Sequence, residues 1–84
     1  MKTVSEFKRT IAVGQLWHAF NHPMNRDMGI RKVSRVQSNS FAFETPRGES
    51  WCDFPKARDY QYVDDNTCNI LEDGQLVLTY RRQL

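Results

Sequence analysis

The chain has 84 residues, 39% of them hydrophobic and 12% aromatic, and a formal net charge of +2. This length fits a single domain spanning residues 1–84, because domains usually contain about 50–250 residues. Ten aromatic side chains exclude a disordered tail and suffice for one small core. The chain has no apolar run of about 18 residues and no signal-peptide pattern, so we expect a soluble cytoplasmic protein that does not enter a membrane.

Positive charge is concentrated in the first half of the chain. Residues 1–40 carry a net charge of +5, and residues 41–84 carry −3. This asymmetry is typical of a surface that meets a polar partner, although solvated strand faces and loop tips produce the same pattern.

The start of the chain predicts a short helix. Thr3 and Glu6 have the spacing of a capping box, in which each side chain accepts a hydrogen bond from the backbone amide of the other residue. Val4, Phe7 and Ile11 then fall on one helical face. A helix this short is marginal in water by itself. We therefore expect its apolar face to dock on a sheet and to close one end of a barrel.

The rest of the chain predicts six or seven short strands separated by turn-forming Asn, Pro, Asp and Gly residues. The expected strands are Gln15–Phe20, Arg31–Gln37, Phe41–Phe43, Trp51–Phe54, Tyr60–Val63, Thr67–Leu71 and Leu76–Tyr80. Pro55–Arg58 predicts one helical or 3₁₀ turn, and Arg81–Leu84 a short basic tail. Strands at this spacing favour a mainly β fold, either a small curled antiparallel sheet or an SH3-like barrel, with a short N-terminal α-helix.

Residue parity predicts the details of the sheet. Val33 and Val36 have opposite parity, so a bulge or bend must lie between them. A three-residue turn at Pro46–Gly48 would place Phe43 opposite Trp51 as a cross-strand aromatic pair. The resulting core, capped by Phe7 and Ile11, comprises Leu16, Val33, Val36, Phe41, Phe43, Trp51, Ile70, Leu76 and Leu78.

The longest irregular stretch is residues 21–29, and loops of this length often carry function because a rigid scaffold presents them. Met24 and Met28 would be adaptable apolar contacts, and Arg26 and Arg31 would steer the encounter with a partner. We therefore expect a protein-binding site formed by Met24, Arg26, Met28 and Arg31.

The alternative is a nucleic-acid interface, in which exposed Trp17 or Tyr60 stacks a base. Its phosphate contacts would come from a basic face formed by Arg31, Lys32, Arg35, Lys56 and Arg58. The low net charge and the eight acidic residues of the second half disfavour strong non-specific binding of this kind.

Motifs for catalysis or metal binding are weak. His18, His22, Cys52 and Cys68 are the right number of ligands for a tetrahedral zinc site, but they lack a Cys-x-x-Cys spacing. A nucleophilic pair of Cys52 with a histidine would lack a third, orienting group. We therefore predict a non-catalytic protein without metal or cofactor, in which both cysteines are free thiols.

Residues 13–15, 31–41, 50–57 and 73–81 together resemble a pattern found in small accessory proteins of phages and integrated mobile elements. The resemblance implies a viral protein that acts in the cytoplasm of a bacterial host cell. It carries over no functional residue, because no activity is assigned to such proteins. The combined prediction is a binding module that engages a host protein, for example as an inhibitor, with nucleic-acid binding as the alternative.

Overall fold

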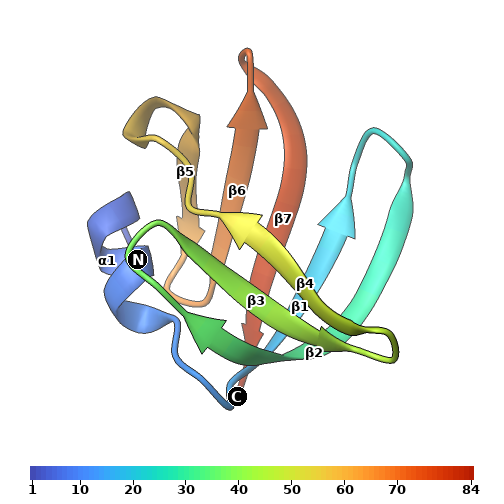
Figure 1. Cartoon of the computed structure of the whole chain (residues 1–84). Coiled ribbons are helices and arrows are strands. Elements are labelled where there is room, and N and C mark those ends of the chain that lie inside the picture. Colours follow the sequence, from blue (N-terminus) through green and yellow to red (C-terminus); the bar gives the residue numbers. More distant parts are fainter.

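The computed structural model describes all 84 residues and consists of one curled seven-stranded antiparallel sheet with a short helix packed on it (Figure 1). In chain order the elements are α1 (Val4–Thr10), β1 (Leu16–Asn21), β2 (Arg26–Val36), β3 (Ser40–Thr45), β4 (Gly48–Asp53), the 3₁₀ turn η1 (Ala57–Asp59), β5 (Tyr60–Asp64), β6 (Thr67–Glu72) and β7 (Gln75–Gln83). The strand order is β4-β3-β2-β1-β7-β6-β5. The predicted mainly β fold is confirmed, with β4 and β5 as the two edges of a sheet that does not close. None of the helices is long and apolar enough to cross a membrane.

The central β1–β7 pairing joins the two ends of the chain. Strand β7 continues to Gln83, and its Arg81 and Arg82 pair with His18 and Trp17 of β1. The predicted basic tail is therefore wrong. Strand β1 uses only one side to pair with β2, so the backbone groups on its other side require the last residues of β7 as partners.

The predicted irregular loop at residues 21–29 is also wrong, because most of it belongs to a β-hairpin. The turn occupies residues 22–25, and β2 begins at Arg26. Met28 is an extra residue in the β1–β2 ladder, and Gly29 beside it has a φ of +80°. This bulge interrupts the strand-like alternation of side chains, and residues 21–29 were therefore predicted to be a loop.

The bulge predicted in the second half of β2 is confirmed. Val33 pairs with Phe43, whereas Arg35 already pairs with Ala42, so Ser34 is the extra residue.

The predicted Phe43–Trp51 pair is wrong by one position. Only Pro46 and Arg47 separate the paired residues Thr45 and Gly48, so the turn has two residues and not three. Phe43 consequently pairs with Ser50, and Trp51 pairs with Ala42. A shift of one residue moves a side chain to the other face of the sheet, and Trp51 is 45% exposed.

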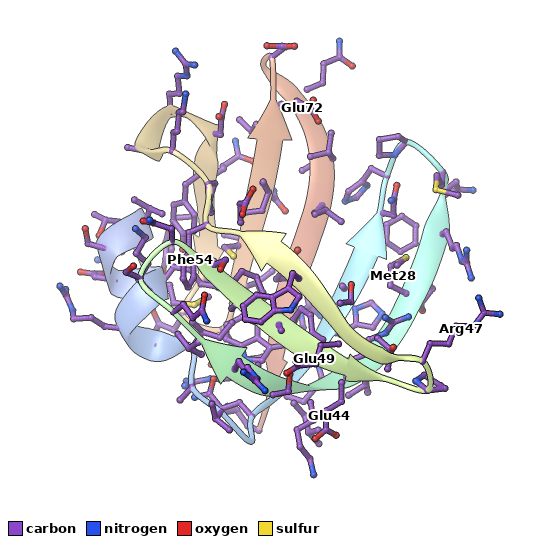
Figure 2. All side chains as sticks on the ribbon, in the orientation of Figure 1. Met28, Glu44, Arg47, Glu49, Phe54 and Glu72 are labelled. Carbon is purple, nitrogen blue, oxygen red and sulfur yellow. The ribbon has the colours of Figure 1, made fainter.

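The helix is capped at its start and anchored by Phe7, as predicted. The Thr3 hydroxyl accepts from the Glu6 amide at 3.2 Å. The Glu6 carboxylate accepts a hydrogen bond from the backbone amide of Lys2 and not, as the capping box predicted, from that of Thr3. Phe7 is fully buried beneath the helix. Figure 2 shows Phe54 between α1 and the end of β4, and the ring centroids of Phe7 and Phe54 are 5.7 Å apart.

The core lies on the inner face of the curled sheet, against α1. Its buried residues are Phe7, Ile11, Trp17, Val33, Phe41, Phe43, Cys68 and Tyr80.

Three predicted core residues are wrong. Leu16, Trp51 and Leu76 are 44%, 45% and 37% exposed, whereas Trp17 is 1% exposed. Strand β1 turns its odd-numbered residues inward, and the indole of Trp17 donates to Gln15 Oε1 at 3.0 Å. That hydrogen bond allows the larger ring to be buried in place of Leu16.

Candidate functional site

An apolar hollow of about 180 Å³ opens on the inner face of the sheet, where the core ends. It lies away from α1, which covers the other part of this face (Figure 1). Phe43 and Tyr80, with ring centroids 6.1 Å apart, connect this inner hollow to the core. The inner hollow is lined by Ala19, Met28, Arg31, Phe43, Ser50, Cys52, Leu78 and Tyr80.

Arg31 is the one charged side chain of the inner hollow. It is half-buried, and it makes neither an ion pair nor a side-chain hydrogen bond. A guanidinium held without a partner beside apolar walls is a strong site for a carboxylate, since it can donate two parallel hydrogen bonds. The inner hollow can therefore accept an apolar group together with a negative one.

Met28 reaches the inner hollow because of the bulge in β2. It is the residue without a partner in the β1–β2 ladder, and it lies at this hairpin in Figure 2. Methionine is flexible and polarisable, so it can adapt to apolar groups of different shapes.

Both cysteines are free thiols, and burial keeps them protonated. Burial raises the pKa of Cys52, which lines the inner hollow, and it raises the pKa of Cys68 to about 12. A thiol with a raised pKa is a poor nucleophile at neutral pH. Cys52 therefore contributes an apolar surface to the inner hollow.

The four residues of the predicted protein-binding site divide into two pairs. Met28 and Arg31 line the inner hollow together. Met24 is 65% exposed on the turn of the hairpin, and Arg26 opens β2 opposite Asn21. The β1–β2 hairpin, which forms in place of the expected loop, therefore separates Met24 and Arg26 from Met28 and Arg31.

The predicted basic face does not form one surface. Arg31 and Lys32 are successive residues of β2, so they point to opposite faces of the sheet. Arg35 lies on the outer face, where its Nε donates to Glu49 Oε2 at 3.0 Å. Figure 2 shows Glu44 and Glu49 projecting from this part of the sheet, so acidic side chains accompany the basic ones.

The other members of that prediction lie elsewhere. Lys56 precedes η1 and Arg58 lies in it, where Arg58 lines a polar depression with Glu72 and Asp73 of the β6–β7 hairpin. Trp17 is buried and Tyr60 donates its hydroxyl proton to the Met1 carbonyl, so neither ring is the exposed stacking platform that was predicted.

The histidines are engaged separately, and no group of three or more His, Cys, Asp or Glu side chains could hold a metal ion. His18 Nε2 lies 2.7 Å from Asp27 Oδ1, and His22 Nε2 lies 2.7 Å from Thr79 Oγ1.

A second concavity, of about 370 Å³, lies on the outer face of β1 and β7. None of the residues predicted to bind protein or nucleic acid lies in this outer hollow, which is lined by His18, Phe20, His22, Thr79 and Arg81. The signal was present in the even parity of His18 and Phe20, but parity alone does not show which face meets solvent.

Comparison of the chain with protein-family models, with curated proteins and with solved structures gave no match. The geometry and chemistry of the inner and outer hollows are therefore the basis for inferring a function.

Proposed function

We propose that the protein is a non-catalytic binding module that engages another protein through the inner hollow. The hollow takes an apolar side chain of the partner, and Arg31 binds a carboxylate next to that side chain. One observation carries the proposal: Arg31 is half-buried, unpaired and surrounded by apolar walls. The resemblance to phage and mobile-element proteins would make the partner a bacterial host protein.

The size of the inner hollow favours a single side chain over a small molecule. Pockets for small ligands usually measure about 300–1,000 Å³, whereas the inner hollow measures about 180 Å³. Burial of one large apolar side chain contributes about 1.5–3 kcal/mol, and a hydrogen bond to a charged group contributes about 1.5–3 kcal/mol. These gains are modest against the cost of association, so the rim of the hollow must supply further contacts.

The chemistry of the chain supports a role in binding. The thiols of Cys52 and Cys68 have raised pKa values. His18 and His22 line the outer hollow, on the opposite face of the sheet from Cys52 and Cys68, so neither histidine lies beside a thiol as a base.

Pull-downs from bacterial lysate, with and without nuclease, test the proposal with three single variants. Arg31→Gln removes the charge from the inner hollow, and Met28→Ser removes its adaptable apolar wall. Arg47→Gln is the matched control, because Arg47 is exposed at the tip of the β3–β4 hairpin (Figure 2). We expect capture of a specific protein to fall at least about tenfold with the first two variants, by loss of about 1.4 kcal/mol each, and to stay unchanged with the control.

Three results would contradict the proposal. Capture could disappear on nuclease treatment, or it could persist in both Arg31→Gln and Met28→Ser. It could also be lost only in the double variant Met24→Ala, Arg26→Ala, which would place the contact at the hairpin turn. Dispersed NMR spectra of each variant establish that the fold is intact before capture is compared.

A further inference from the structure

We propose that the outer hollow is a binding site for a nucleobase and its adjoining phosphate. The site lies on the opposite face of the sheet from the inner hollow, so the inference is independent of the proposed protein-binding function. Three features carry it: an aromatic ring, an arginine held in position without an ionic partner, and a row of hydrogen-bonding side chains.

The aromatic ring is Phe20, which is half-buried on the outer face of β1 and lines the outer hollow. Its ring centroid is 4.9 Å from that of His22, and the two rings are tilted by 59°. They form two walls of a corner. Nucleobases stack on aromatic side chains of this kind whatever their sequence, because every base has a π face.

Arg81 is positioned for a phosphate. Its Nε donates to Thr67 Oγ1 at 3.1 Å, which fixes the plane of the guanidinium, while its two terminal amino groups make no hydrogen bond. A hydrogen bond from the Asn66 amide, and to a smaller extent the charge of Arg81, lowers the pKa of Asp64. Asp64 and Arg81 nevertheless form no ion pair. The free amino groups can donate two parallel hydrogen bonds to a phosphate.

A row of hydrogen bonds crosses three strands beside Phe20. Thr79 Oγ1 donates to Asn69 Oδ1 at 2.7 Å, and Asn69 Nδ2 donates to Gln61 Oε1 at 2.9 Å. Because the Thr79 hydroxyl gives its only proton to Asn69, it must accept from His22 Nε2, 2.7 Å away. The row therefore fixes the orientation of the His22 ring, whose other nitrogen stays available to a base edge, and it leaves the Gln61 amino group as a donor on β5. Base edges offer complementary acceptors and donors.

The charges around the outer hollow suit an anionic ligand. Asp27, the carboxylate beside His18, accepts hydrogen bonds from the Gly29 amide and from His18, which lower the pKa of Asp27. Lys32 projects from the same outer face, two residues along β2 from the partner of His18. Arg81 and Lys32 thus place two positive charges on the outer face, where the nearby carboxylates of Asp27 and Asp64 both accept backbone hydrogen bonds.

A nucleobase with a phosphate could come from a free nucleotide or from a single-stranded nucleic acid. The test is an NMR titration of the ¹⁵N-labelled full chain with AMP, with dTMP, and with short oligo(A) and oligo(dT) strands. We expect backbone amides of β1 from His18 to Asn21 and of β7 from Thr79 to Arg81 to shift together. Saturation by the mononucleotides identifies a free nucleotide, and binding of the oligonucleotides alone identifies a single strand.

The same titration with variants tests the assigned roles. Phe20→Leu keeps an apolar side chain but removes the π face, and should weaken binding at least about fivefold. Arg81→Gln should weaken binding and reduce the slope of log affinity against log salt for a strand by about one. Arg47→Gln, at the tip of the β3–β4 hairpin, is the control of equal charge change and should leave binding unchanged.

The proposal fails if saturating AMP, dTMP and both strands leave these amides unshifted, or if the shifts instead cluster around the inner hollow. It also fails if Phe20→Leu and Arg81→Gln alter binding no more than Arg47→Gln does. Should either of the first two variants not fold, His22→Leu, which removes a hydrogen-bonding wall of the outer hollow, decides in its place, and unchanged base binding in that variant overturns the proposal.

Discussion

Replacing Phe7 with Ala should remove much of the stability of this domain, because Phe7 connects the helix to the sheet. Its side chain is fully buried, and its ring contacts those of Trp17, Phe41, Phe54, Tyr60 and Tyr80 at centroid distances between 5.7 and 6.4 Å. A buried Phe→Ala change usually costs about 3–5 kcal/mol. Five aromatic neighbours place Phe7 at the upper end of that range.

This loss is a large fraction of the total free energy of unfolding of the domain. Domains have about 0.05–0.15 kcal/mol of stability per residue, which amounts to about 4–13 kcal/mol for a chain of this length. The seven residues of α1 cannot hold a helix without tertiary contacts. We therefore expect Phe7→Ala to undock α1 and to leave a sizeable unfolded population at room temperature.

Urea unfolding followed by tryptophan fluorescence measures this loss, because Trp17 is buried against Phe7. Phe7→Leu, which keeps an apolar side chain, should cost clearly less than Phe7→Ala. Phe20→Ala serves as a second control on the outer face. A Phe7→Ala loss of under about 1 kcal/mol, or one equal to that of Phe20→Ala, would refute the central role of Phe7 in the core.

Three further predictions concern the helix cap, the buried thiol and the β2 bulge. Thr3→Ala should lower the unfolding free energy by about 1 kcal/mol in urea titrations, because the Glu6 amide loses its acceptor. The melting temperature should fall as pH rises above about 9, because the unfolded chain releases the Cys68 proton near its ordinary pKa of 9.0, whereas the folded chain holds it to about 12; Cys68→Ala should flatten this fall. Gly29→Ala should cost about 1–2 kcal/mol because φ is +80°, although the added Cβ meets no atom within 4 Å, and equal stability of variant and parent would contradict backbone strain as the cause.

Local signals in the sequence correctly predicted the features that depend on neighbouring residues. Thr3 accepted the predicted hydrogen bond at the helix start, and Phe7 and Ile11 are buried as the helical spacing required. The conflict of parity between Val33 and Val36 located a real bulge. These features follow from backbone geometry and side-chain periodicity over a few residues, which any single sequence contains.

The candidate sites depended on contacts that local patterns do not encode. Met28 and Arg31 were predicted to act together, but their place on an apolar hollow follows from the curl of the sheet, which brings β4 and β7 to the same space. The outer hollow requires the pairing of His18 with Arg81, residues from opposite ends of the chain. Neither hollow could be predicted, because residues 21–29 were expected to form a loop and residues 81–84 a tail.

The sequence by itself therefore determined the mainly β class, the approximate positions of the helix and the seven strands, and the identity of the helix face. Only the tertiary structure decided which face of β1 became the core, where Trp17 replaced Leu16, and which polar residues came together outside it. The physical reason is that a strand alternates with period two whichever face is inward, so a shift of one residue exchanges core and surface without changing the pattern. Long-range pairing between β1 and β7 helps to fix that choice, because it satisfies the backbone groups that pairing with β2 and with β6 leaves free on these strands, in a register that buries the larger rings.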